Sequence, residues 1–133
     1  MRFLTLLLLF TLPLQTVSAD SWPEMAEEIV VHIDRSTEFY QAGELKKAAQ
    51  EVVKAYFGIF EDKKMEAAIR VTVGSKHAWL VERLFGKLRK AIKGEAGLEA
   101  VMEAAEKIRE AVRRDALVLV EKEIPLEVFQ PNQ

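Results

Sequence analysis

The sequence contains no cysteine and only two histidines among its 133 residues. Without thiols, the chain cannot form disulfide bonds, thiolate metal sites, c-type haem attachments or cysteine nucleophiles. Basic residues are not in excess either, since 19 Lys and Arg stand against 21 Asp and Glu and give a net charge of −2. A mildly acidic chain without a basic stripe is not expected to bind nucleic acid. The fold must therefore rely on its apolar core.

Long apolar runs are confined to the N-terminus. Residues 1–19 combine the basic Arg2, an apolar run and a small-residue ending at Val17–Ala19, which is the arrangement of a secretory signal peptide cleaved after Ala19. A retained membrane anchor is the alternative, but the apolar run is short for a bilayer span. Cleavage removes the positive charge of Arg2, so the net charge of residues 20–133 is one unit more negative than that of the full chain. We expect a periplasmic or secreted single domain with no membrane-spanning segment after cleavage.

Glycine and proline are scarce, at six and four residues, and most of the chain is periodic like amphipathic helices. A first helix is predicted to begin at Ser21, which is a good N-cap with Glu24 three residues later, and to end at Gly43. The other predicted helices run from Glu44 to about Glu61, from Met65 to Ile92 and from Leu98 to Leu119. Four such helices with short connections predict an all-α, antiparallel up-and-down four-helix bundle. A non-helical tail is expected at about residues 124–133.

Each predicted helix has an apolar stripe at steps of three and four residues. The stripes comprise Trp22, Met25, Ile29, Ile33, Ser36 and Tyr40; Leu45, Ala49, Val52, Tyr56 and Ile59 or Phe60; Met65, Ile69, Val73, His77, Leu80, Leu84, Leu88 and Ile92; and Leu98, Val101 or Met102, Ala105, Ile108, Val112 and Leu119. Polar residues on these stripes are informative because such side chains are rarely buried without a partner.

His77 is the clearest polar residue on an apolar stripe, between Val73 and Leu80. It is either a half-buried histidine bonded to a carboxylate or carbonyl, or an inward-facing metal ligand. Glu66 lies on the same face of an unbroken helix, but the rise of 1.5 Å per residue separates the two by about 16 Å. They cannot hold one ion together along such a helix. Each would need partners from neighbouring helices.

The other histidine, His32, follows Glu28 by four residues, which favours a helix-stabilising pair over two metal ligands. A ferritin-like di-iron site is not expected because neither histidine has a glutamate three residues earlier. The glutamates of the last predicted helix lie largely off its apolar stripe and should form a solvated face. They are Glu99, Glu103, Glu106 and Glu110.

A b-type haem is a weaker alternative, with Met25 or Met102 set against His77, because methionines at helical spacing usually fill the core. No haem is therefore expected. Catalysis is not expected either. Ser75 and His77 are two residues apart and do not face each other on a helix, and there is no Gly-rich phosphate loop.

The segment AYFGIFEDKKMEAAI, residues 55–69, presents two carboxylates, Glu61 and Glu66, at a corner between two predicted helices. Carboxylates are ligands for hard cations, and two of them converge more easily across a corner than along a straight helix. Glu66 could instead cap the third helix while Glu61 pairs with a lysine. Lys63 and Lys64 lie in the same corner and oppose cation binding.

The spaced residues of this region carry a resemblance to a known family. Ala55, Tyr56, Phe60, Glu61 and Glu66, followed by the V-E-x-x-F-x-x-L-R pattern of residues 81–89, resemble the extracytoplasmic N-terminal domain of bacterial high-affinity iron permeases. That domain has a glycine two residues before its second glutamate, where this chain has a lysine. The Y-x-x-G-E junction at residues 40–44 is similar as well, and the likeness covers most of residues 29–93.

The resemblance implies a periplasmic helical protein that works with a membrane iron permease. Its acidic landmarks fall on Glu61, Glu66 and Glu82, with His77 as an inward-facing candidate partner. The sequence has no membrane permease segment and no R-E-x-x-E motif. Residues 109–113 begin like this motif but end in arginine. It is thus expected to be a freestanding accessory protein that binds iron weakly or docks on a permease. The alternative is a purely structural helical interaction module without metal.

Overall fold

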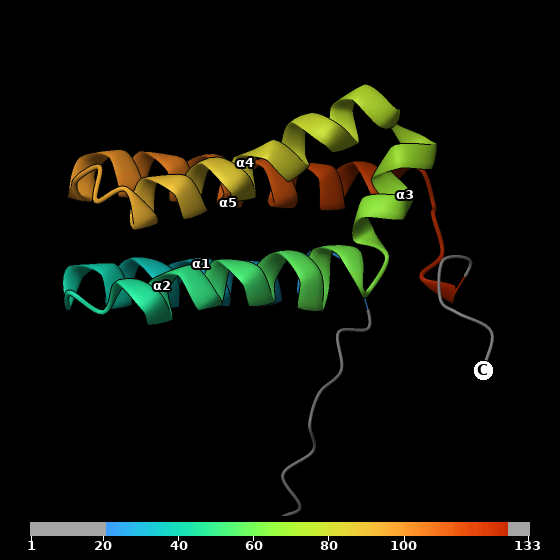
Figure 1. Cartoon of the computed structure of the whole chain (residues 1–133). Coiled ribbons are helices and arrows are strands. Elements are labelled where there is room, and N and C mark those ends of the chain that lie inside the picture. Colours follow the sequence, from blue (N-terminus) through green and yellow to red (C-terminus); the bar gives the residue numbers. More distant parts are fainter. Residues whose placement is uncertain (1–20, 128–133) are drawn as a thin grey trace, which may run out of the picture.

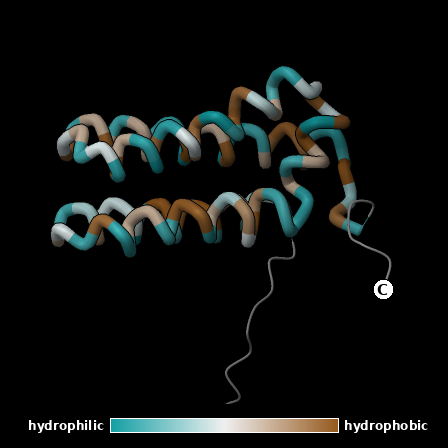
Figure 2. The backbone as a smooth tube through the Cα atoms, in the orientation of Figure 1, coloured by the Kyte–Doolittle hydropathy of each residue, from teal (hydrophilic) through white to brown (hydrophobic). Residues whose placement is uncertain are grey.

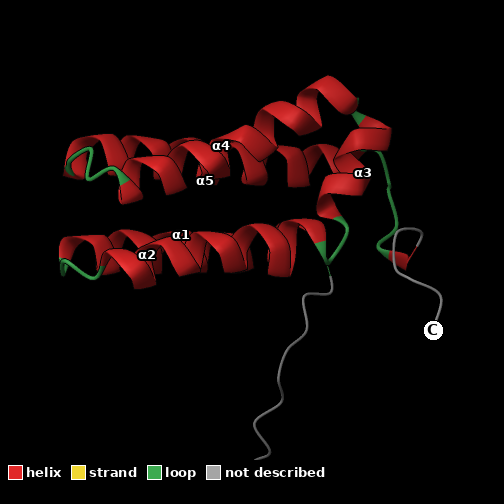
Figure 3. Cartoon of the chain, in the orientation of Figure 1, coloured by secondary structure: helices red, strands yellow, loops and turns green. Residues whose placement is uncertain are grey.

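The computed structural model describes residues 21–127, and every regular element in this range is a helix (Figure 3). The elements are α1 (Trp22–Gln41), α2 (Leu45–Val53), the π-helix η1 (Lys54–Glu61), α3 (Met65–Thr72), α4 (Ser75–Lys93) and α5 (Leu98–Glu121). The all-α prediction is confirmed for this part of the chain. The predicted signal peptide, residues 1–19, and the end of the predicted tail, residues 128–133, lie outside the described residues.

The helices form two layers (Figure 1). The lower layer holds α1 and α2 with η1, the upper layer holds α4 and α5, and α3 passes between the layers at one end. Helix α1 packs on both α2 and α5, and α4 packs on α5 and α2. Hydrophobic and hydrophilic residues alternate along each helix, as expected for amphipathic helices that share one core (Figure 2).

The first helix begins and ends as its sequence predicts. Ser21 has an extended backbone and its hydroxyl accepts a hydrogen bond from the Glu24 amide at 3.2 Å, which satisfies one of the free amides of the first turn. Gly43 takes a φ of +77°, and the chain then turns into α2. Of the predicted stripe only Tyr40 is not fully buried. Local capping and the apolar stripe therefore agree in this helix.

The second predicted helix also ends at Glu61, but its second half is not an α-helix. From Lys54 onward the backbone widens into the π-helix η1, and the Asp62 amide bonds to the Phe57 carbonyl five residues earlier at 3.1 Å. The wider turn places Ile59 and Phe60 in the core together. π-Helical turns are rare and occur frequently at functional sites.

The prediction of one unbroken helix from Met65 to Ile92 is wrong. The helix stops at Thr72 and restarts at Ser75, because Gly74 adopts a φ of +127° that side chains with a Cβ rarely take. The break shifts the first part of the buried stripe of α4 by one residue, whereas Leu88 and Ile92 at its end are buried as predicted. Val81 and Phe85 are buried, whereas the predicted Leu80 is 47% exposed.

The last helix and the start of the tail follow the prediction. The buried residues of α5 include Val101, Ala105, Ile108, Val112 and Leu119, and all four outer glutamates are exposed. Residues 124–126 are not α-helical, and the Ile124 carbonyl accepts a hydrogen bond of 2.7 Å from the Trp22 indole. None of the helices within residues 21–127 is both long and apolar enough to cross a membrane.

Candidate functional site

The predicted corner between Glu61 and Glu66 exists as a tight turn between η1 and α3. Glu61 is the last residue of η1 and is exposed, and Glu66 lies in the first turn of α3 with 17% of its side chain exposed. Between them Lys64 takes a left-handed backbone with φ +68° and ψ +16°. Met65 follows directly and is fully buried, which anchors the start of α3 in the core. The turn thus places the two carboxylates on successive helices.

Tyr56 connects this corner to α4. Its hydroxyl donates a hydrogen bond of 2.7 Å to Glu82 Oε1, although the two residues are 26 positions apart in sequence. Burial of the phenol and the bond to Glu82 raise the pKa of Tyr56 above its usual 10, and the negative charges of Glu61 and Glu66 raise it further. All three glutamates predicted for the site therefore act electrostatically on one buried phenol, which stays protonated at neutral pH.

An aromatic cluster holds this phenol in place. The ring centroids of Tyr56 and Phe85 lie 5.4 Å apart, those of Phe60 and Phe85 5.2 Å, and those of Tyr56 and Phe60 6.0 Å. Phe57 meets the Tyr56 ring edge-on at 4.7 Å but is itself 57% exposed. Aromatic contacts of this kind add about 0.5–1.5 kcal/mol per pair beyond the area they bury. The cluster fixes η1 against α4 at the level of Glu82.

Two basic side chains of this region form ion pairs, one of them with a carboxylate of the corner. Arg70 bonds Glu66 from one turn later, with its Nε 2.8 Å from Oε1. Lys63 pairs with Glu28 of α1, so its ammonium group is held by a carboxylate outside the cluster. Among residues 21–127 no three His, Asp or Glu side chains are grouped closely enough to hold a metal ion. The acidic cluster of Glu61, Glu66 and Glu82 is an open surface rather than a closed coordination shell.

His77 contacts a different partner. Its Nε2 lies 3.0 and 2.9 Å from the two oxygens of Asp115 in α5. Asp115 is only 2% exposed, whereas the His77 side chain is 30% exposed. The imidazole therefore joins α4 to α5 as a half-buried histidine bonded to a carboxylate, one of the two roles that its position predicts. The contact gives no support to a haem ligand at Nε2, and Met102 is 38% exposed.

His32 shows the same arrangement in the other layer. Its Nδ1 lies 2.6 Å from Oε2 of Glu51, and Lys54 Nζ lies 2.7 Å from Oε1 of the same carboxylate. Burial by itself raises the pKa of Glu51, but the hydrogen bonds from His32 and Lys54 together hold it below its usual 4.5. The predicted pair of His32 with Glu28 is absent, because each of these residues has another partner.

Two buried carboxylates were not predicted from the sequence. Asp115 follows Ile108 and Val112 at steps of four and three residues, so its place on the apolar stripe was visible in the spacing. Glu51 lies beside Val52 and one turn after Ala48, with no comparable signal. Each carboxylate is hydrogen-bonded to a histidine of a neighbouring helix and lies within ion-pair distance of a basic side chain, Lys54 for Glu51 and Arg114 for Asp115.

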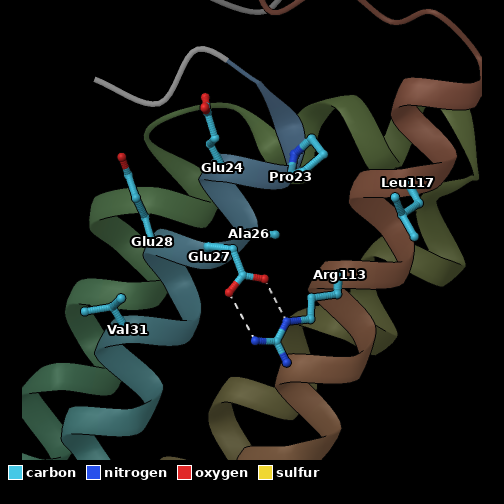
Figure 4. A pocket seen from close by; sticks show the side chains of 8 residues that line it. All are labelled: Pro23, Glu24, Ala26, Glu27, Glu28, Val31, Arg113 and Leu117. Atoms are coloured by element: carbon cyan, nitrogen blue, oxygen red, sulfur yellow. Dashed lines mark hydrogen bonds and ion pairs between the residues drawn. The ribbon is translucent and has the colours of Figure 1, made fainter. Parts of the chain in front are cut away.

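A hollow of about 630 Å³ lies between α1 and α5, away from the acidic cluster (Figure 4). Glu27 and Arg113 bridge it through two contacts of 2.7 and 3.0 Å, and this bond lowers the pKa of Glu27. The hollow is lined by Pro23, Glu24, Ala26, Glu27, Glu28, Val31, Arg113 and Leu117. Glu27 and Arg113, the charged residues that face each other across the hollow, are already paired with each other.

Comparison with known proteins adds no identification. No family model matches the sequence, and no curated protein or solved structure matches it either. The likeness to the iron-permease domain therefore rests on the sequence pattern alone.

Proposed function

We propose that this protein is an extracytoplasmic helical accessory protein of iron uptake, similar to the N-terminal domain of bacterial iron permeases. The observation that carries the proposal is the contact between two distant parts of the sequence pattern. Tyr56 of the first part donates to Glu82 of the second, and Phe60 of the first packs on Phe85 of the second. Residues that define the pattern in sequence are thus residues that meet in space.

The turn supplies a second, independent support. In the family pattern a glycine stands two residues before the second glutamate, which corresponds to Lys64 before Glu66. Lys64 has the left-handed backbone that favours glycine, with φ +68°. Lysine pays a cost in strain at this position, where the family's glycine would not. The local geometry therefore agrees with the pattern even where the residue departs from it.

The proposed architecture is the antiparallel up-and-down four-helix bundle. Its members are α1, α2 continued by η1, the joined α3 and α4, and α5. The contacts of α1 with α2 and α5, and of α4 with α2 and α5, support it, because each helix meets two neighbours around one core. In this arrangement the break at Gly74 is a bend within the third rod.

Iron is the proposed cargo, bound transiently by the acidic cluster. Three carboxylates around an uncharged phenol provide a concentrated negative field for an arriving cation. Arg70 neutralises Glu66 until a cation displaces it, and the open geometry allows fast release. A partner iron permease would receive the ion. Weak, reversible contact suits delivery better than storage.

The test is calorimetric titration of the purified protein with Fe²⁺ without oxygen and with Fe³⁺ in a weak chelate. The site variant carries Glu61→Gln, Glu66→Gln and Glu82→Gln. The matched control carries Glu99→Gln, Glu103→Gln and Glu110→Gln on the exposed face of α5, and removes the same charge.

We expect the control to bind iron as the wild type does and the site variant to bind at least about tenfold more weakly, a difference of about 1.4 kcal/mol. Equal binding by all three proteins, or no binding by the wild type, refutes the iron site. The second outcome leaves the alternative of a structural interaction module, which the internal pairing of Glu28, Glu51 and Asp115 favours. A Soret band in the purified protein would instead indicate a b-type haem.

A further inference from the structure

A basic groove runs between the α2–η1 rod and α4, on the far side of the Tyr56–Glu82 contact from the turn. Three adjoining hollows of about 240, 380 and 400 Å³ make it up. Val53 and Arg89 line both the first and the second hollow, and Arg89 and Lys93 line both the second and the third. The first two hollows thus form one groove between the α2–η1 rod and α4, and the third adjoins it on the surface of α4.

The second and third hollows are lined by Lys46 of α2 and by Arg89, Lys90 and Lys93 of α4, with no acidic side chain. Within residues 21–127 these four cations have no ion-pair partner, whereas Lys54, Lys63, Arg70, Lys107, Arg109 and Arg113 are all paired. Four like charges along one groove repel each other unless an anion lies between them. The groove therefore has an excess of positive charge that the described fold does not use.

Helix stability explains only part of this charge. Lys90 and Lys93 lie in the last turn of α4, where a cation interacts favourably with the helix dipole. Lys46 lies in the first turn of α2, where the dipole has the opposite sign, and the acidic N-cap residue Glu44 is paired with Lys47 instead. Arg89 lies at the centre of the groove and is shared by all three hollows. These two residues point to an external anion.

The other end of the groove is largely apolar, and the Tyr56 hydroxyl donates to the one carboxylate that lines it, Glu82. Phe57, which is 57% exposed, lines it together with Val52 and Phe85. At Gly86 an added Cβ would meet nothing within 4 Å, so the floor is open along α4. An occupant thus meets an aromatic side chain at one end and three to four cations at the other. A linear, concave surface of this kind fits a chain segment better than a flat bilayer.

We propose that this groove docks an acidic segment of a partner protein, with an aromatic or aliphatic side chain against Phe57 and carboxylates against Lys46, Arg89 and Lys93. The groove is argued from its own residues and does not depend on iron binding. If the accessory role in iron uptake also holds, the docked partner would lie beside Glu82, at the edge of the acidic cluster.

The probe is a fluorescein-labelled peptide of six alternating Asp and Glu residues around one Trp, followed by fluorescence anisotropy at low ionic strength. The groove variant is Lys46→Glu/Arg89→Glu/Lys93→Glu, and the matched control is Lys76→Glu/Lys87→Glu/Lys122→Glu, which reverses three exposed charges elsewhere. Circular dichroism confirms that both remain helical.

We expect the groove variant to weaken peptide binding at least about tenfold and the control to change it less than about twofold. Phe57→Ala, or a peptide with Ala in place of Trp, should weaken binding several-fold, which a purely ionic contact would not show. Absence of binding, or equal loss in the control, overturns the proposal. Vesicles of phosphatidylglycerol in phosphatidylcholine serve as the second probe. If the wild type binds vesicles but not the peptide, and the groove variant loses vesicle binding, the occupant is a lipid surface.

The two proposals fail separately. The groove variant keeps Glu61, Glu66 and Glu82 and removes nearby positive charge, so its iron binding should not weaken relative to the wild type whether or not the peptide binds. Loss of iron binding in the carboxylate variant likewise leaves the groove charges unchanged. A result in one assay therefore does not decide the other.

Discussion

Replacing Lys64 by glycine should stabilise the protein, although it removes a side chain. Lys64 precedes α3 with a left-handed backbone, φ +68° and ψ +16°, and is the N-cap of that helix without a side-chain cap bond. A left-handed backbone costs a residue with a Cβ about 1–2 kcal/mol. Glycine removes this cost but gives the unfolded chain more freedom, which offsets about 0.4–1 kcal/mol. The expected net gain is about 0.5–1 kcal/mol.

For a domain of this size such a gain raises the midpoint of thermal unfolding by about 2–4 °C. The assay is thermal unfolding followed by circular dichroism, with the free energy of unfolding from urea titration as a second measure. Lys64→Ala is the control, because it removes the same charge and keeps the Cβ. It should leave stability unchanged or slightly lower it.

The reasoning is refuted if Lys64→Ala stabilises as much as Lys64→Gly, since the gain would then come from removing a charge. It is also refuted if Lys64→Gly destabilises the protein. Iron binding separates the electrostatic effect from the backbone effect. Both variants remove one positive charge beside Glu61 and Glu66, so both should strengthen any iron contact to the same small extent.

Three further perturbations test the fold and the site. Gly74→Ala should lower the free energy of unfolding by about 1–2 kcal/mol in urea titration, because its φ of +127° strains any residue with a Cβ. An unchanged free energy of unfolding would mean that the fold does not need this backbone at Gly74. Glu51→Gln should destabilise the protein by about 1–3 kcal/mol at neutral pH. Since the pKa of Glu51 lies below its usual 4.5, its contribution is present above that pH and is lost as the pH falls through the lowered pKa, so the gap between variant and wild type should close on acidification; a gap independent of pH would contradict the ion-pair explanation. In an alkaline absorbance titration of the folded protein, the pKa of Tyr56 should lie above its usual 10. Glu82→Gln should lower the pKa of Tyr56, and a wild type whose Tyr56 ionises at its usual pKa would show that the phenol is not held against a carboxylate.

Much of the fold could be predicted because its signals are local. Ser21 caps α1 by accepting a hydrogen bond from the amide three residues later, and Gly43 ends the same helix through its left-handed backbone. The apolar stripes of α1 and α5 lie within single helices and needed no knowledge of their partners. The outer glutamates of α5 were predicted as a solvated face for the same reason.

The third predicted helix shows where periodicity misleads. A stripe that resumes after a break at nearly the same phase looks continuous, so the spacing from Met65 to Ile92 concealed the stop at Gly74. The dipeptide Gly74-Ser75 was the local signal, since glycine commonly follows a helix and serine often starts one. The shift of burial from Leu80 to Val81 followed from the break. The widening of η1 left no such signal.

The candidate site divides in the same way. The amino-acid sequence by itself determined most of the helix ends, the cap of α1, and the corner that carries Glu61 and Glu66. Only the tertiary structure decided which side chains meet: Tyr56 with Glu82, His77 with Asp115 rather than with a glutamate, and Lys46 beside Arg89 along one groove. The reason is physical. Caps and stripes depend on residues within one or two turns, whereas these contacts join residues 26 to 43 positions apart, whose proximity is set by the packing of whole helices against a common core.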